Sequence, residues 1–192
     1  TMGFERDNLL HFARYLARFL FLTLRDLPRY LRRKGRVELA RRTLLGEAAL
    51  FALFLAAGLV SWRATLCVFG APYLFMRMAM MAGNWGQHAF IDPARPGDAY
   101  VNSITCINTR YNRRCFNDGY HIGHHVRATR HWTEMPGDLE ANIAEYARRG
   151  ALVFDGLDFF SVWVLLMLRK YDILARHVVA LDGREKSHDE IK

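Results

Sequence analysis

The chain has 192 residues, 52% of them hydrophobic, and its 27 lysines and arginines outnumber its 19 acidic residues to give a net charge of +8. This length predicts one domain or part of a larger one, and the apolar, basic composition is typical of a membrane protein whose loops face anionic lipid. Nucleic-acid binding is disfavoured because long apolar runs interrupt the positive charge, and three widely spaced cysteines argue against a secreted disulfide framework and for a reducing compartment.

Residues 1–41 are predicted to be an amphipathic, basic region that lies flat in the membrane interface. Residues 5–24 mix Leu, Phe and Tyr with arginines. In a helix, three arginines of this region share one face: Arg14, Arg18 and Arg25. The apolar face of such a helix inserts below the lipid headgroups. Pro28 is expected to end the helix, and a dense positive block follows over residues 31–42.

Two apolar runs predict a transmembrane helical hairpin over residues 42–83. The runs, residues 43–62 and 64–82, hold one charged residue each, and both are long enough to cross a hydrocarbon core of about 30 Å. The short connection between them makes the two helices antiparallel, with Trp62 and Arg63 at the tip. The positive-inside rule then places both open ends of the hairpin in the cytoplasm.

Glu47 and Arg77 are the charged residues inside these runs, and each costs roughly 2.5 to 3.5 kcal/mol at the centre of a bilayer. Glu47 lies four residues inside the start of the first run and Arg77 five before the end of the second. With a constant rise per residue, the two side chains therefore lie at similar depths. We predict that they pair directly or through water, the alternative being that each reaches the near interface independently.

Residues 84–150 are more polar and predict a cytoplasmic region of short helices and loops. Residues 151–174 are apolar, but their uncharged stretch, residues 159–168, is too short to span a membrane. An interfacial or re-entrant helix is therefore expected, and a charged tail from Asp182 completes the region 151–192. The expected fold is an all-α integral membrane protein, with a transmembrane hairpin, interfacial helices and a cytoplasmic helical cap that carries metal ligands.

Three of the eight histidines lie within five residues: His121, His124 and His125. Positions i, i+3 and i+4 of a helix share a face, so these imidazoles converge on a small volume. His88 follows the second apolar run, four residues after Asn84. Because the predicted hairpin returns the chain to the cytoplasmic side, all four histidines should emerge at one membrane surface. The pattern predicts a common metal centre just outside the bilayer.

These features resemble the membrane fatty acid desaturases, which carry histidine boxes of the forms HxxxH, HxxHH and HxxHH and an additional histidine at the end of the last span. Here the last box lies in Asn-Asp-Gly-Tyr-His-Ile-Gly-His-His, and the additional element is Asn84 with His88. The segments His-Trp-Thr-Glu-Met-Pro, from His131, and Asp-Phe-Phe-Ser-Val-Trp, from Asp158, are also similar to that family. The resemblance covers most of residues 1–180.

The resemblance implies an O2-dependent desaturase that introduces a double bond into a long acyl chain of a lipid or thioester, at a di-iron centre. Its implied iron ligands are His88, His121, His124 and His125. Asn84 would hold a metal-bound water, and no catalytic residue separate from the ligands is implied. Asp118 and Glu134 are candidate acceptors for ligand N–H groups, although a helix cap or a surface carboxylate explains each of them equally well.

The implied chemistry fits histidine, because removing hydrogen from an unactivated methylene needs a strong oxidant made from O2 and two external electrons. Imidazoles suit iron and are not oxidised as thiolates are. The implied partners are membrane lipid, an acyl-chain substrate and an electron donor of the cytochrome b5 or ferredoxin type. The implied location is the endoplasmic reticulum of a eukaryote or the inner membrane of a bacterium, with the metal site on the cytoplasmic side.

The chain departs from the family pattern in its number of histidines. Outside residues 121–125 there is no HxxxH box and no second HxxHH box, and the other histidines are isolated: His11, His131, His177 and His188. Four histidines and one asparagine cannot supply two irons at usual coordination. We therefore expect the C-terminal portion of a desaturase that is inactive alone because two N-terminal boxes are missing.

Three other interpretations stay open. The ligands do not distinguish a desaturase from a lipid hydroxylase or ketolase of the same superfamily, and the ligand count also fits a non-catalytic membrane protein with one metal half-site. Zinc could occupy imidazoles, although the cysteines lie outside any spacing of a structural Cys/His zinc site. A basic cluster before the box could receive an acidic headgroup, an acyl-carrier phosphate or an acidic electron donor, or could simply be solvated: Arg110, Arg113 and Arg114.

Overall fold

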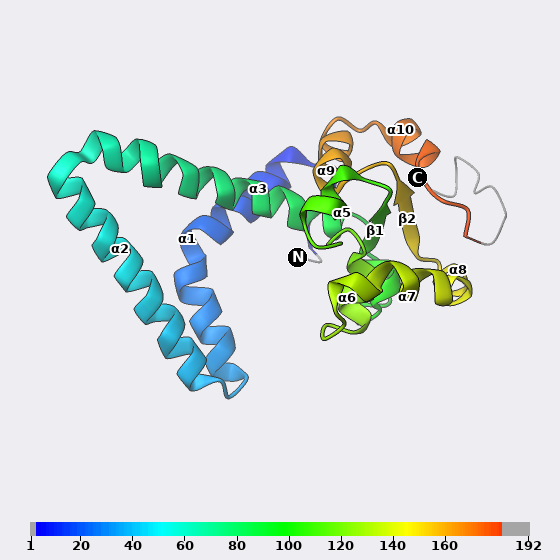
Figure 1. Cartoon of the computed structure of the whole chain (residues 1–192), viewed down its shortest axis with the longest axis horizontal. Helices are drawn as coiled ribbons and strands as arrows, with labels where there is room; N and C mark the ends of the chain where they lie inside the picture. The colour runs from blue at the N-terminus through cyan, green and yellow to red at the C-terminus, as the bar shows by residue number, and fades with distance from the viewer. Residues whose placement is uncertain (1–2, 182–192) are drawn as a thin grey trace. The chain divides into compact units, whose positions relative to one another are not determined.

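The computed structural model describes residues 3–181, which are 69% helix and 5% strand. They form two compact units (Figure 1). The helical unit comprises residues 13–81, and the histidine unit comprises the described residues 3–12 and 82–181. The predicted charged tail from Asp182, with His188, lies outside the described residues.

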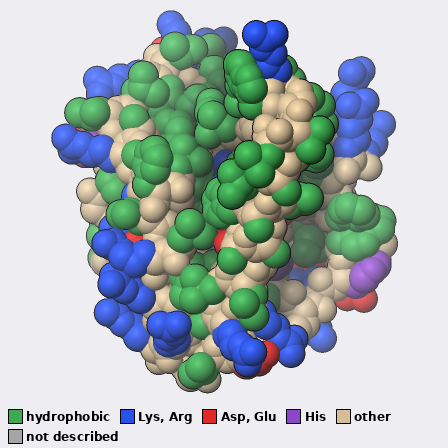
Figure 2. Space-filling view, turned by 90° about the vertical axis from the view of Figure 1, so that its left-hand side faces the viewer, with side chains coloured by type: hydrophobic (Ala, Val, Ile, Leu, Met, Phe, Trp, Pro, Cys, Tyr) green, Lys and Arg blue, Asp and Glu red, His purple; other side chains and the backbone are tan. Residues whose placement is uncertain are grey.

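The helical unit is built from four consecutive helical segments: α1 (Leu9–Arg33), α2 (Val37–Thr65), the π-helix η1 (Leu66–Gly70) and α3 (Ala71–Gln87). Helices α1 and α3 continue into the histidine unit. Residues Val37–Gln87 form one run of 51 residues that is long and apolar enough to cross a membrane, and its most apolar stretch is not buried inside the protein. Figure 2 shows hydrophobic side chains gathered on one face of the molecule, with arginines and lysines around them.

Helix α1 does not end at Pro28, as the sequence suggested. Pro28 lies inside the helix, which continues to Arg33. Gly35 follows two residues after this end, and its φ of +72° is a left-handed conformation that costs glycine little. The Arg36 N–H donates to the Leu31 carbonyl at 2.9 Å, the long-range bond of a glycine-terminated helix end. The prediction was wrong because a proline removes only one backbone hydrogen bond, so the helix can continue past it. The left-handed conformation of Gly35, by contrast, turns the chain out of the helix.

The two predicted membrane runs lie in one continuous, bent helical segment without a loop between them, and a membrane-spanning hairpin stays a prediction. The bend includes Ser61, whose φ of −157° and ψ of 98° are not helical, and the π-helix η1. Trp62 and Arg63, the expected tip, are themselves within α2. Extra or missing hydrogen bonds within a helix bend it without a loop, and apolar periodicity does not reveal such defects.

Side chains bridge the two arms of this bend. Arg77 Nη2 lies 3.3 Å from Glu47 Oε1, and both side chains are about four-fifths buried, with exposed fractions of 19% and 22%. The predicted pairing of these two charges is therefore confirmed. The Phe54 ring contacts the rings of Phe69 and Tyr73, each at a centroid distance of 5.8 Å. The arms thus meet through an ion pair and aromatic contacts.

The histidine unit consists of short elements around a small sheet. Its helices after α3 are α4 (Ala99–Asn102), α5 (Arg110–Arg114), α6 (His121–Val126), the 3-10 helix η2 (Trp132–Glu134), α7 (Met135–Ala141), α8 (Ile143–Arg149), α9 (Phe159–Met167) and α10 (Tyr171–Arg176). Its strands are β1 (Ile104–Ile107) and β2 (Leu152–Asp155). The strands pair in parallel, with Ile104 opposite Leu152 and Ile107 opposite Asp155.

The described residues are mostly helical, as expected, but the small sheet was not predicted, and it places a strand at the start of a segment predicted as helix. Both strands are short runs of apolar and β-branched residues, largely buried, a pattern that periodicity cannot separate from a buried helix. Gly150 and Gly156, with φ of +75° and +72°, bracket β2 and interrupt the helical pattern on both sides.

The core of the histidine unit consists of two clusters, one on the sheet with α9 and α10 and one under α6. Helix α9 directs three side chains at helical spacing into the first cluster: Phe159, Val162 and Leu166. The second cluster holds Ile122 of α6 with Leu139, Tyr146 and Val153. Phe160 and Leu168 point outward, with exposed fractions of 55% and 61%. Contact of this helix with a membrane interface remains a prediction.

Candidate metal centre

Three imidazoles converge in the histidine unit. His88 follows the end of α3, and His121 and His125 lie one turn apart on α6. Their ligand atoms all lie within 4.8 Å of one another. His121 Nε2 is 3.4 Å from His88 Nε2 and 3.0 Å from His125 Nε2. Residues 33 positions apart in the sequence thus share one small volume.

Strand β1 and helix α5 fix where α6 begins. The Asn112 side chain donates to the Cys106 carbonyl at 2.8 Å, and its Oδ1 accepts from the Gly119 N–H at 2.9 Å. The Cys106 N–H also donates to the Gly119 carbonyl at 2.8 Å. A Cβ on Gly119 would lie only 2.1 Å from Asn112 Oδ1. Glycine therefore permits the close approach that sets the position of His121, two residues later.

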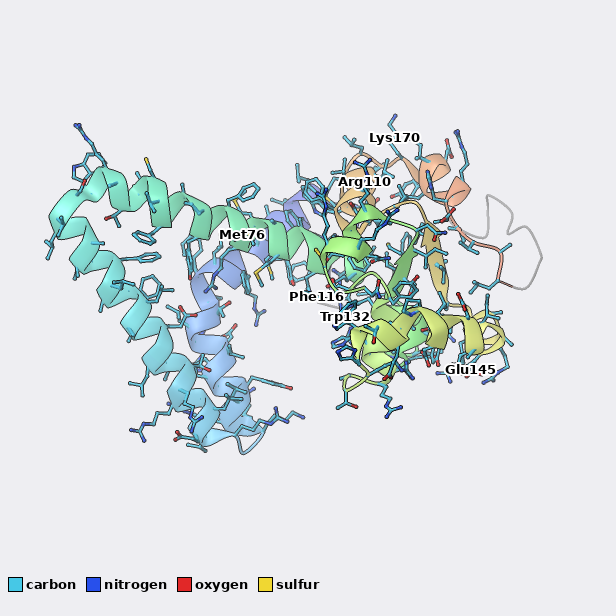
Figure 3. All side chains as sticks on the ribbon, in the orientation of Figure 1. Met76, Arg110, Phe116, Trp132, Glu145 and Lys170 are labelled. Carbon is cyan, nitrogen blue, oxygen red and sulfur yellow. The ribbon has the colours of Figure 1, made fainter. Side chains whose placement is uncertain are left out.

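The rest of α6 is held from its buried side and by the loop that follows it. Ile122 is fully buried. Arg130 pairs with Asp138 of α7, and both side chains are mostly buried. The Asn117 side chain donates to the Trp132 carbonyl at 3.0 Å, and the ring of Phe116 contacts that of Trp132 edge to face, at 5.5 Å between centroids (Figure 3). These contacts tie the segments before and after α6 together.

The end of α3 is fixed independently, which positions His88. Trp85 is fully buried, and its Nε1 donates to the Arg6 carbonyl at 2.8 Å. Gly86 packs directly on α9, because a Cβ there would lie 2.2 Å from the Phe159 carbonyl oxygen. The His88 Nδ1 lies 2.7 Å from the main-chain carbonyl oxygen of Asn102. His88 therefore leaves its Nε2 for the group of three.

Burial keeps these imidazoles neutral. Burial, as the largest cause, and the neighbouring imidazoles together lower the pKa of His121 to about 3. Burial also lowers the pKa of His88, with Arg6 adding to the effect, and lowers that of His125 together with His88 and His124. Neutral imidazole is the form that binds a metal, so the group needs no deprotonation near pH 7.

The donor set fits a single metal ion. Imidazole nitrogens at about 2.0 to 2.1 Å from an ion lie about 3.0 to 3.4 Å apart, and the distances of His121 Nε2 from the other two Nε2 atoms are in this range. His121 Nδ1 is buried and has no hydrogen-bond partner among residues 3–181. The Nε2 atom of His121 faces those of both other rings, and a cation among them would be bound by all three nitrogens at once. Imidazole ligands suit iron, zinc, copper or nickel.

The other predicted ligands lie around this group. His124 is exposed on α6, and its ring stacks on that of His121 at 5.8 Å between centroids, outside the group of three. Asn84 lines an open pocket of about 400 Å³ together with His88 and His125. The structure therefore brings three of the four predicted histidines into ligand distance and places Asn84 on the adjoining pocket wall.

The two candidate acceptor carboxylates have different surroundings. Asp118 Oδ2 accepts from the Tyr111 hydroxyl at 2.6 Å and from the Gln87 side chain at 3.0 Å, so it connects α5 to the end of α3. Glu134 is exposed at the start of α7, where its side chain makes no capping hydrogen bond. The structure shows an acceptor for His88 that the sequence did not indicate, the main-chain carbonyl of Asn102. Every residue has a main-chain carbonyl, so neither residue type nor spacing in the sequence could have indicated this acceptor.

The family model for fatty acid desaturases matches residues 3–157, which include both histidine elements. The chain belongs to the fatty acid desaturase family. This confirms the resemblance found in the sequence. Fatty acid desaturases are metal-dependent, membrane-associated oxidoreductases with fatty-acyl substrates. No curated protein and no solved structure matches the chain.

Proposed function

We propose that this desaturase-family chain provides part of the iron ligands of an O2-dependent acyl desaturase. The observation that carries the proposal is the convergence of His88, His121 and His125, whose ligand atoms lie within 4.8 Å of one another. Two separate sequence elements of the family match supply these nitrogens. Bound iron would supply the oxidising power that removes two hydrogens from neighbouring methylenes, with O2 and two external electrons as co-reactants.

The protein's own residues would hold and orient the metal. His88, His121 and His125 would bind one ion directly, and the exposed His124 would bind a neighbouring ion after rotation of its side chain. Asn84, on the wall of the 400 Å³ pocket with His88 and His125, would hold a metal-bound water. Two irons need more donors than these residues offer, so we propose that the remaining ligands come from outside residues 3–181 and that this chain is inactive without them.

The helical unit would place this centre at a membrane surface. Its 51-residue apolar helical run would cross the bilayer, and the arginine-rich segment before it would stay on the cytoplasmic side. The exposed arginines of α5 would receive an acidic electron donor: Arg110, Arg113 and Arg114.

A second candidate is a non-catalytic, metal-binding membrane protein. It is favoured by the size of the observed donor group, since three imidazoles complete one ion's protein ligands, as in many zinc sites. The two candidates differ in the metal retained and in the product formed. A hydroxylase or ketolase would use the same ligands and would differ only in inserting oxygen.

Metal analysis and product analysis test the proposal together. The full chain, purified in detergent after loading with Fe2+, should retain about one iron per chain, and the variant His121→Ala should retain none. Co-expression with a protein segment that carries HxxxH and HxxHH boxes should yield unsaturated fatty acids in the host lipids. Hydroxylated products would indicate a hydroxylase. Retention of zinc but never iron would overturn the desaturase proposal in favour of the non-catalytic one.

A further inference from the structure

The hydrogen bond of His88 determines which of its ring nitrogens faces the metal group. Its Nδ1 lies 2.7 Å from the Asn102 carbonyl oxygen, which can only accept. The proton must therefore be on Nδ1, and the Nε2 of the neutral ring carries the lone pair. Nε2 is the atom that lies 3.4 Å from His121 Nε2. Turning or removing this carbonyl would release the ring from that orientation.

The carbonyl of Asn102 is held by the side chain of the same residue. Asn102 Nδ2 donates to the Arg95 carbonyl at 2.6 Å and to the Asp98 carbonyl at 2.8 Å, and its Oδ1 accepts from the Asp92 N–H at 3.0 Å. One carboxamide thus connects three points of the loop over residues 92–98. It uses both of its N–H donors and its oxygen.

That loop is itself fixed to the elements that carry the other imidazoles. Asp98 caps α4 by accepting from the Tyr100 N–H at 3.1 Å, and it pairs with Arg149 of α8 at 2.7 Å. The Arg149 guanidinium also lies over the Tyr100 ring, at 5.0 Å. Helix α4 contacts both α6 and α8. The acceptor for His88 is therefore connected to α6 through packed structure.

We propose that Asn102 is a positioning residue of the metal centre, whose side chain, through its bonds to the loop over residues 92–98, fixes its own main-chain carbonyl at the end of α4, and that this carbonyl holds His88 in its Nδ1-protonated form. The inference rests on the proposed function, since it takes His88 as a metal ligand. Partners of this kind orient a ligand and raise its basicity, and losing one costs about 10- to 100-fold in metal affinity.

Cobalt binding by the full chain in detergent tests this role, with Co2+ alone as the probe and its visible absorption as the readout. Asn102→Ala should raise the dissociation constant about 10- to 100-fold. Asn142→Ala is the matched control, because Asn142 Nδ2 makes the same bond four residues back, to the Asp138 carbonyl at 2.8 Å, without contact to His88. The control should bind Co2+ as the wild-type protein does.

A measurement on the wild-type protein covers the case in which Asn102→Ala does not fold. Nitrogen-15 spectra of the metal-free, histidine-labelled chain, with His88→Gln for assignment, should show His88 protonated on Nδ1. In a folded Asn102→Ala variant, the same resonance should shift toward a mixture of the two neutral forms. A purely structural role of Asn102 would leave this signature unchanged.

The outcomes separate this inference from the proposed function. Wild-type Co2+ affinity in Asn102→Ala, together with weak binding by His88→Ala, would overturn the role of Asn102 and leave the metal centre intact. A wild-type His88 protonated on Nε2 would overturn it as well. Unchanged binding in His88→Ala would remove His88 from the site and overturn both proposals.

Discussion

At the scale of single residues, His121 is the centre of the proposed site. It is the most buried of the three imidazoles, with 7% of its surface exposed, and its Nε2 lies close to both of the others. We expect His121→Ala to weaken Co2+ or Fe2+ binding by more than about 100-fold, because loss of an outer partner alone costs up to that much. Metal titration of the purified chain measures the effect.

His131→Ala is the control for this variant, since His131 is exposed and its Nδ1 contacts the Thr133 hydroxyl at 2.7 Å. It should bind metal as the wild-type chain does. Equal affinities of the two variants would exclude His121 from the metal site.

The buried imidazoles also predict a dependence of stability on pH. The pKa of His121 is lowered to about 3 from an ordinary value of 6.5, so between these values the unfolded chain binds the extra proton. The stabilisation is complete above about pH 6.5 and is lost as the pH falls toward 3. The thermal unfolding midpoint of the metal-free protein should fall over this window. His121→Leu should make the decline shallower, and parallel curves for both proteins would contradict the assignment.

At the scale of elements, the packing of α3 on α9 depends on one glycine. A Cβ at Gly86 would lie 2.2 Å from the Phe159 carbonyl oxygen, whereas Gly83, on the same helix, has no atom within 4 Å of such a Cβ. We expect Gly86→Ala to destabilise the protein by about 1 to 3 kcal/mol, as overpacking does. Gly83→Ala should be neutral or stabilising by up to about 1 kcal/mol, because alanine favours helix. Denaturation curves of both variants measure the contrast, and equal effects would show that α3 and α9 are not in close contact.

The ion pair of the helical unit gives a second prediction at this scale. Glu47→Gln or Arg77→Met alone leaves one mostly buried charge without its partner, which is costly, whereas the double variant removes both charges. We expect the double variant to be more stable than the sum of the single effects by about 0.5 to 3 kcal/mol. Thermal unfolding in detergent provides the four values. Strict additivity would mean that the two side chains do not interact.

The sequence predicted those features that follow from local geometry. Helical spacing indicated the convergence of His121 and His125, and equal depth in two apolar runs indicated the pairing of Glu47 with Arg77. It failed where local patterns are ambiguous. The four-residue strand β2 lies in an apolar run that also reads as helix. The i, i+3, i+4 rule places His124 on the same face, but its exposed ring stacks on that of His121 outside the group of three, so its role as a ligand stays a prediction.

At the scale of the whole molecule, the central prediction is the crossing of a membrane by the helical unit. Lys34 lies before α2 and Arg63 near its end, on either side of the apolar part of α2. In a cysteine-free background, Lys34→Cys and Arg63→Cys should react with a membrane-impermeant maleimide from opposite faces of sealed vesicles. Labelling of both from one face would show that this segment does not cross.

The parts of the fold that no pattern indicated are those that depend on distant partners. The side chain of Asn112 connects β1 to Gly119 by hydrogen bonds. Asn102 contacts the loop over residues 92–98 through its side chain and His88 through its main-chain carbonyl. Each is a polar residue in a polar stretch, so neither stands out by type or spacing. Their hydrogen bonds form only after folding has brought the partner groups close to them. A single sequence does not show which groups will be close.

Strands β1 and β2 pair in parallel, and α6 lies between them in the sequence. A nascent polypeptide that ends before residue 152 already holds every imidazole of the metal group but lacks the strand that closes the support beneath it. In the proposed metal centre, a rigid arrangement of these imidazoles would therefore form only after residue 155 has left the ribosome and β2 has paired with β1. A premature stop between α6 and β2 would release a product that holds all three imidazoles of the group but lacks the strand that supports α6.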